Sequence, residues 1–236
     1  LDLCEERTEL KCKYLHKATA GAGTDEDVLI QILCPATDSE LKKLDQTYRR
    51  IYGTDLNSLI KSEISGDFQK LMLEILKADR PSREDVNDAA AKADAETLLR
   101  EGEGKIGTNE DVFIDILTNR SRTHIHQVCR HYEQLTGHTL EKAIKSEMSG
   151  DFRKALIGTI KPEGEYYAHL FDEAMRGIGT NDNQLVRLMS TLTKAQLKKA
   201  NEVYTKQYSK TLHAAIKSET SGSYQKTLLG LIPPIV

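Results

Sequence analysis

The feature that most constrains this chain is an internal repeat that occurs three times in one register. In each copy a glycine-rich segment is followed by the glutamate of a Lys-Ser-Glu triplet. The glycine and the glutamate are always 40 residues apart, and the pairs are Gly23 and Glu63, Gly107 and Glu147, and Gly179 and Glu219. A repeat of this length means that one structural unit has been copied, so the fold must be an array of that unit.

The apolar residues within a unit follow the period of a helix. Leu41, Leu44, Tyr48, Ile51 and Tyr52 are spaced three or four residues apart, which places them on one side of an α-helix. The alternation typical of a strand is missing, so the sequence predicts an all-α protein.

Capping residues divide each unit into about five short helices. A threonine before an acidic first turn favours a helix start, and glycines favour helix ends and breaks. We expect caps at Thr24, Thr108 and Thr180 and at Asp38, Ser121 and Thr193, ends at Gly53 and Gly137, and breaks at Gly66, Gly150 and Gly222. The predicted units are 1–79, 80–161 and 162–236. An additional 12 residues separate the first two copies, in the polar stretch that begins at Asp79 and the Ala-rich helix after it.

Composition excludes several classes of protein. The 236 residues carry 33 Lys and Arg against 36 Asp and Glu, a formal charge of −3, which argues against a nucleic-acid partner. We find no apolar run of about 18 residues and no signal peptide at the polar start, so we expect a cytoplasmic protein. Cys4, Cys12, Cys34 and Cys129 show no CxxC spacing and are interpreted as reduced thiols.

A calcium site explains why a glycine-rich loop and a distant carboxylate recur together. Ca²⁺ takes six to eight oxygen ligands and accepts backbone carbonyls, a bidentate carboxylate and waters. Glycines let a loop turn its carbonyls outward, and the intervening helices can return the chain so that the glutamate lies beside the loop. One carboxylate per ion leaves positions that phosphate oxygens can fill.

The pattern of GxGT followed 40 residues later by the Glu of KSExSG resembles the annexin repeat, over nearly the whole chain. The resemblance implies five helices per repeat in a right-handed superhelix, calcium loops on one convex face, and calcium-dependent binding to acidic phospholipid membranes. By position, it implies three sets of calcium ligands, in which carbonyls precede each glutamate: Thr19, Gly21, Gly23 and Glu63; Gly102, Lys105, Gly107 and Glu147; Met175, Gly177, Gly179 and Glu219. The loop tips Ala22, Ile106 and Ile178 would contact the membrane.

Annexins resemble a cycle of four repeats, whereas three are present here. The long first connector and the long middle loop make 1–79, 80–161 and 162–236 resemble the second, third and fourth repeats. The fourth repeat packs on the first in the family, so 162–236 would expose an apolar flank. We therefore expect either a fragment of a longer chain or a self-association that covers the flank.

The sequence also bears on two other functions. An enzyme is not supported, because Leu99 and Ile106 break the P-loop pattern around Gly104-Lys105, and we expect His124, His126 and His131 to be solvated rather than metal ligands. No EF-hand loop is present. A calcium-independent helical scaffold, in which the repeated glutamates only form salt bridges, stays open as the alternative.

Overall fold

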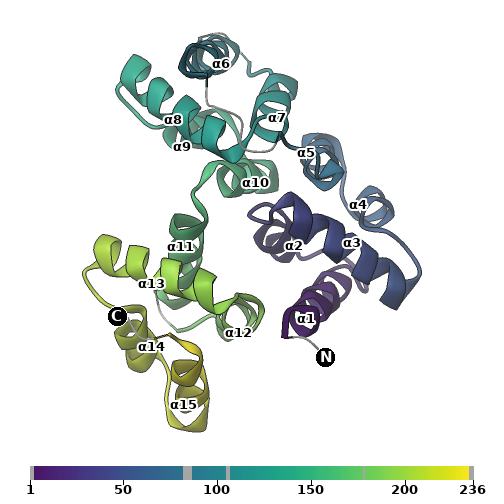
Figure 1. The fold of residues 1–236 in the computed structure, drawn as a ribbon, viewed down its shortest axis with the longest axis vertical. Coiled ribbons are helices and arrows are strands. Elements are labelled where there is room, and N and C mark those ends of the chain that lie inside the picture. Colours follow the sequence, from purple (N-terminus) through teal and green to yellow (C-terminus); the bar gives the residue numbers. More distant parts are fainter. Residues whose placement is uncertain (1–2, 82–86, 105–106, 178, 234–236) are drawn as a thin grey trace. The chain divides into compact units, whose positions relative to one another are not determined.

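The computed structural model describes residues 3–81, 87–104, 107–177 and 179–233, and over these residues the chain forms fifteen α-helices and no strand (Figure 1). Five helices fall within each predicted unit. The unit 1–79, here called the first repeat, contains α1 (Leu3–Ala18), α2 (Glu26–Leu33), α3 (Asp38–Tyr52), α4 (Leu56–Glu63) and α5 (Gly66–Lys77). The middle repeat contains α6 (Asp88–Glu101), α7 (Glu110–Asn119), α8 (Arg122–Thr136), α9 (Leu140–Glu147) and α10 (Gly150–Ile160). The third repeat contains α11 (Glu163–Met175), α12 (Asp182–Thr191), α13 (Lys194–Tyr208), α14 (Leu212–Glu219) and α15 (Gly222–Leu231).

Most of the predicted helix boundaries are confirmed. Ser121 and Thr193 cap α8 and α13, and Gly53 and Gly137 end α3 and α8 in the left-handed conformation. The last helix of each repeat begins at the predicted glycine, at Gly66, Gly150 and Gly222.

Four predicted caps are wrong. Helix α3 is capped by Thr37, not Asp38, because Thr37 and Glu40 form a reciprocal capping box. Thr24, Thr108 and Thr180 do not cap the second helix of their repeats, whose N-cap residues are Asp25, Asn109 and Asn181. The threonine hydroxyls are therefore available for other contacts.

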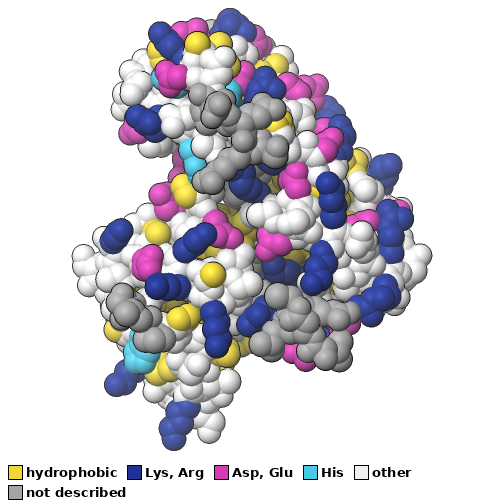
Figure 2. Space-filling model, viewed as in Figure 1, with side chains coloured by type: hydrophobic (Ala, Val, Ile, Leu, Met, Phe, Trp, Pro, Cys, Tyr) yellow, Lys and Arg dark blue, Asp and Glu magenta, His cyan; other side chains and the backbone are white. Residues whose placement is uncertain are grey.

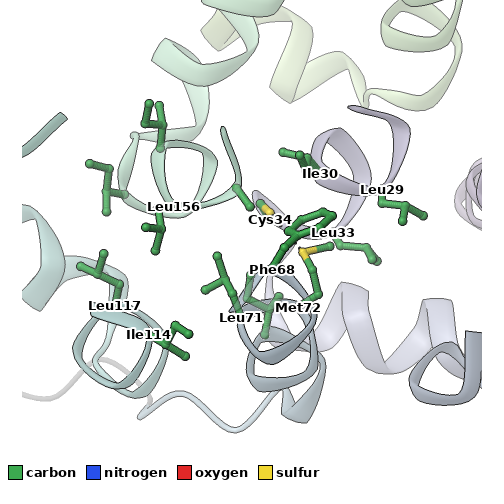
Figure 3. Packing of buried hydrophobic residues seen from close by; sticks show 14 of the residues in the cluster. Leu29, Ile30, Leu33, Cys34, Phe68, Leu71, Met72, Ile114, Leu117 and Leu156 are labelled. Carbon is green, nitrogen blue, oxygen red and sulfur yellow. Dashed lines mark hydrogen bonds between the residues drawn. The ribbon is translucent and has the colours of Figure 1, made fainter. Parts of the chain in front are cut away.

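The chain divides into two compact units, one formed by Leu1–Leu10 with Lys161–Val236 and the other by Lys11–Ile160. In the second of these, α2 and α5 of the first repeat pack against α7 and α10 of the middle repeat. Figure 3 shows this core, with Leu33 and Leu71 among the side chains that fill it. One arginine crosses between the repeats, because Arg122 donates to the carbonyl of Ala36 at 2.8 Å. Arg80, at the start of the middle repeat, donates to the carbonyl of Leu117 within that repeat, also at 2.8 Å.

The third repeat has its own core, in which α11 packs along α13 and contacts α12 and α14. Val186 and Leu231 are 37% and 44% exposed, although the matching Ile30 and Ile75 of the first repeat are buried. That a further repeat or a second copy of the chain covers these side chains stays a prediction. No helix in the described part of the chain is long and apolar enough to cross a membrane.

Candidate functional site

The three repeated glutamates occupy the same place, the last residue of a short helix. Glu63 ends α4, Glu147 ends α9 and Glu219 ends α14, and the next residue of each is extended. Glu63 and Glu147 are partly buried, whereas Glu219 is exposed. The break after each helix leaves the carboxylate at a helix end, beside the loop that opens the same repeat.

The loops that face these glutamates are here called the first loop (18–25), the middle loop (101–109) and the third loop (174–181). In the first, the Thr24 hydroxyl donates to Glu63 Oε2 at 3.2 Å, and in the middle, the Thr108 hydroxyl donates to Glu147 Oε2 at 3.3 Å. In the third loop the Thr180 hydroxyl donates instead to the backbone carbonyl of Glu219, at 3.3 Å. The tertiary structure thus brings loop and glutamate together in every repeat.

A serine hydroxyl lies beside the glutamate in two repeats. Ser62 Oγ is 3.2 Å from Glu63 Oε1, and Ser218 Oγ is 3.3 Å from Glu219 Oε1. Each hydroxyl also lies nearer a backbone carbonyl, that of Leu59 at 2.9 Å and that of Ala215 at 2.8 Å, so the carboxylate is its alternative acceptor. The triplet is recognisable in the sequence, but the contacts of its serine and of the loop threonine are not.

The first and third loops share their closing hydrogen bond and the conformation of their described glycines. An amide-to-carbonyl hydrogen bond of 2.8 Å closes each loop over seven residues, from Asp25 to Ala18 and from Asn181 to Ala174. The glycines at the predicted ligand positions, Gly21, Gly23, Gly177 and Gly179, have φ between 88° and 115°. L-residues with side chains rarely adopt such values, so these loops depend on glycine for their shape.

The middle loop differs in length. It closes over eight residues, through a 2.9 Å hydrogen bond from the Asn109 amide to the Glu101 carbonyl. Gly102 is buried beneath Phe113, with room for little more than hydrogen, while Gly107 has φ 80°. Lys105 and Ile106, and Ile178 of the third loop, are sequence-predicted site residues that lie outside the described residues.

The remaining predicted residues have different exposures. Ala22 is exposed at the tip of the first loop, as are Gly21 and Gly23, and Gly107 is exposed in the middle loop. Thr19 is partly buried, and its hydroxyl donates to the His16 carbonyl at 3.1 Å. Met175 is 7% exposed in the core of the third repeat, so only its backbone could serve as a ligand.

A buried tyrosine of the third helix lies near the loop in each repeat: Tyr48, Tyr132 and Tyr204. Burial raises the pKa of Tyr48 and Tyr204 to about 12, and nearby acids, including Glu63 and Glu219, act in the same direction. Burial also raises the pKa of Tyr132, and its hydrogen bond to Glu103 adds to this. All three phenols stay protonated at neutral pH and can donate hydrogen bonds. The sequence predicts these tyrosines as core residues alone.

The donor set suits a hard cation. Within the described ranges no three His, Cys, Asp or Glu side chains come together as a metal cluster. Each candidate site offers one carboxylate, with loop carbonyls and hydroxyls beside it. Such a set fits Ca²⁺, which accepts carbonyl oxygens and water, better than zinc, which prefers nitrogen and sulfur.

The expectation that the histidines of α8 are solvated is wrong for two of them. His124 Nε2 lies 2.8 Å from Asp94 Oδ2, and His131 Nε2 lies 2.7 Å from Asp88 Oδ1, both across the packed α6 and α8. Their side chains are 12% and 15% exposed. These contacts pair each histidine with one carboxylate of α6.

The fold and the loops define a repeat protein of the annexin class, and comparison with known proteins agrees. The annexin family model matches residues 11–75, 93–158 and 166–231. Annexin A4 of Homo sapiens is 36% identical over 220 residues, which are 92% of this chain and 69% of that protein. The solved structure of annexin III superimposes with a TM-score of 0.88 at 34% identity, covering 95% of this chain and 71% of that one. The chain belongs to the annexin family.

The chain spans part of its relatives. Annexin A6 of Gallus gallus is 37% identical over 222 residues, which are 93% of this chain but 33% of annexin A6. The annexin family is known for calcium-dependent phospholipid binding in general.

Proposed function

We propose that this chain binds acidic phospholipid membranes through Ca²⁺ ions held between its loops and its three repeated glutamates. The ligands would be the carbonyls of Thr19, Gly21 and Gly23 with Glu63, and the matching residues of the other repeats: Gly102, Lys105, Gly107 and Glu147; Met175, Gly177, Gly179 and Glu219. The observation that carries the proposal is the contact between loop and glutamate, with the Thr24 and Thr108 hydroxyls at 3.2 and 3.3 Å from the carboxylates.

The single carboxylate of each site explains why lipid would be needed. Ca²⁺ requires six to eight oxygens, and one glutamate with three carbonyls supplies about five. Phosphate and carboxylate oxygens of lipid headgroups would complete the coordination. A site of this kind binds calcium weakly in solution and more tightly at an anionic surface.

Charge favours the same mechanism. The protein carries a formal charge of −3, and both signs are mingled on the face that Figure 2 presents. Three Ca²⁺ ions would bring the charge to about +3, which changes repulsion from an anionic leaflet into attraction. Three weak sites that engage one membrane also raise the avidity by orders of magnitude through effective concentration.

The loop tips would add apolar contact. Ala22 is exposed at its tip, and Ile106 and Ile178 are proposed to enter the interface, where partial burial of an isoleucine contributes about 1 to 2 kcal/mol. We propose a cytoplasmic protein that becomes peripheral on membranes when calcium rises, and no catalytic role.

Vesicle co-sedimentation tests this function. Phosphatidylserine-containing vesicles should sediment the protein with calcium and release it with chelator. Replacing Glu63, Glu147 and Glu219 together by Gln should raise the calcium needed for half-maximal binding at least about tenfold, with helical content unchanged.

A matched control removes the same number of charges away from the loops. Gln at Glu74, Glu96 and Glu202, which lie within α5, α6 and α13, should leave the calcium requirement within about twofold of the wild type. An unchanged requirement in the first triple variant would contradict the site assignment. Binding that ignores the chelator would favour the calcium-independent scaffold.

A further inference from the structure

Between the two residues that close it, the middle loop carries an acid that the other two loops lack there. Glu103 lies in this loop, directly after the buried Gly102, whereas 18–24 and 174–180 contain no acidic residue. Glu103 belongs to no predicted ligand set. Its carboxylate is directed at α8 and the turn that follows α8.

Two side chains meet one oxygen of this carboxylate. The Tyr132 hydroxyl donates to Glu103 Oε2 at 2.7 Å, and His138 Nε2 lies 3.3 Å from the same atom. Tyr132 is fully buried, so its ring is fixed by the core, and burial keeps its hydroxyl protonated. The bond therefore ties an exposed loop to a rigid part of the molecule.

The turn that carries His138 is fixed as well. The Thr136 hydroxyl lies 2.8 Å from the carbonyl oxygen of Tyr132 and 2.9 Å from that of His138, and it can donate to either; Gly137 has φ 77°. The tyrosine and histidine rings lie 6.0 Å apart at an angle of 56°. Both partners of Glu103 thus come from α8 and its C-terminal turn.

The other repeats place aromatic rings in the same region. Tyr52 and Tyr208 stand where the middle repeat has Thr136, and they pack beside Tyr48 and Tyr204 with ring centroids 4.8 and 4.6 Å apart. An aromatic pair therefore occupies this position in the first and third repeats, whereas the middle repeat has a tyrosine that is hydrogen-bonded to a loop carboxylate.

We propose that Glu103 is a positioning residue for the middle calcium site, which it acts on through its bond to Tyr132. The inference rests on the proposed function, because it assumes that the middle loop and Glu147 bind Ca²⁺. Helix α8 also packs against α9, which carries Glu147, so the anchor fixes Gly102 relative to that carboxylate. A restrained loop loses less conformational entropy when an ion binds, so the anchor lowers the calcium requirement of the middle site.

The decisive variant is Tyr132→Phe, which removes the donor and leaves the charge of Glu103 in place. It is made in the Glu63→Gln, Glu219→Gln background, where the middle site is the intact one. Calcium binding is measured by calorimetry with vesicles of phosphatidylserine and phosphatidylcholine. We expect the calcium midpoint to rise about threefold to tenfold, because a hydrogen bond to a charged group is lost.

Glu103→Gln completes a double-mutant cycle. If Glu103 acts through Tyr132, the double variant should bind calcium no more weakly than Glu103→Gln alone. Tyr204→Phe in the same background is the control, since that tyrosine belongs to the third repeat, and it should leave the midpoint unchanged. Circular dichroism and thermal unfolding establish that each variant is folded.

The outcomes separate the two proposals. An unchanged or lowered midpoint in folded Tyr132→Phe, or fully additive effects in the cycle, would overturn the anchor while leaving the calcium function intact. Loss of all calcium dependence in the unmodified protein would instead overturn the function itself.

Discussion

The first and middle loops occupy the same place in their repeats but are built differently. The first loop closes over seven residues and uses glycines that need positive φ in open space, as at Gly21. The middle loop closes over eight, and Gly102 is required there because a side chain would meet Phe113. One loop is shaped by backbone conformation, and the other is shaped by close packing and by the carboxylate of Glu103. Equivalent loops in a repeat protein can therefore respond differently to the same substitution.

The largest difference between the two loops should appear in the free energy of unfolding when Gly102 or Gly21 is replaced by residues of increasing size. At Gly102 an added Cβ lies 3.0 Å from Phe113 Cζ and from the Leu98 carbonyl, so the free energy of unfolding should fall by about 1 kcal/mol for Gly102→Ala and about 3 kcal/mol for Gly102→Leu. At Gly21 nothing lies within 4 Å of an added Cβ and φ is 111°, so Ala and Leu should both cost about 1 to 2 kcal/mol. Urea unfolding measures both pairs. A size dependence at Gly21 equal to that at Gly102 would remove the distinction.

A second contrast concerns a polar contact that is present in the middle repeat alone among the residues at this position. Arg120 Nε donates to Asp94 at 2.8 Å, where His124 also contacts the carboxylate, while the matching residues of the other repeats are Ala36 and Leu192. Arg120→Leu should lower the free energy of unfolding at pH 7 by about 1 to 2 kcal/mol, because a partly buried charged hydrogen bond is lost. Arg130→Leu, at an exposed position of α8, is the control and should change it by less than about 0.5 kcal/mol.

The same contact predicts a pH dependence. Burial raises the pKa of Asp94, but the hydrogen bonds from Arg120 and His124 outweigh it and hold the pKa below its usual value. A carboxylate with a lowered folded pKa stabilises the protein above its unfolded pKa of about 4, and that contribution is lost as the pH falls through the folded value. The difference between wild type and Arg120→Leu should therefore shrink between pH 5 and pH 3 in urea titrations. A constant difference over that range would show that Arg120 acts by packing.

The smallest effect should come from the loop threonines. Thr24 donates to the carboxylate of Glu63, whereas Thr180 donates to the backbone carbonyl of Glu219. Thr24→Val should raise the calcium concentration that its site requires about twofold, because the hydroxyl is lost. Thr24→Ser keeps the hydroxyl and should bind calcium like the wild type. Thr180→Val should have a smaller effect than Thr24→Val. The three substitutions are compared by calcium calorimetry with acidic vesicles. Each is made in a background in which only the site under test keeps its glutamate. Equal effects of both valine variants would mean that the threonines act through the backbone.

Much of the fold could be predicted because it is local and repeated. The 3.6-residue period and the glycines at Gly53, Gly66 and Gly137 predicted helices and their ends, since these depend on neighbours in the chain. Two of the wrong caps lie one residue from the residue that caps the helix: Thr37 caps α3 in place of Asp38, and Asp25 caps α2 in place of Thr24. The two shifts have different consequences. Thr37 only moved a cap by one residue, whereas Thr24 turned out to bond a glutamate 39 residues away.

The contacts that connect distant elements could not be predicted in this way. The pairing of His124 with Asp94 depends on how α6 lies against α8, and the bond from Tyr132 to Glu103 joins residues 29 apart. Nothing in the spacing of these residues distinguishes a paired histidine from a solvated one, because the spacing on one helix carries no information about the helix packed against it.

By itself the sequence determined the helical class, the three copies and the constant interval between glycine and glutamate, because a copied unit repeats its own local preferences. The tertiary structure decided which oxygen each hydroxyl contacts and how the middle loop is held. It also decided which glycines are needed because a side chain would clash and which are needed because φ is positive. Those outcomes depend on distances of about 3 Å between side chains from separate helices, and such distances are set only when the helices pack.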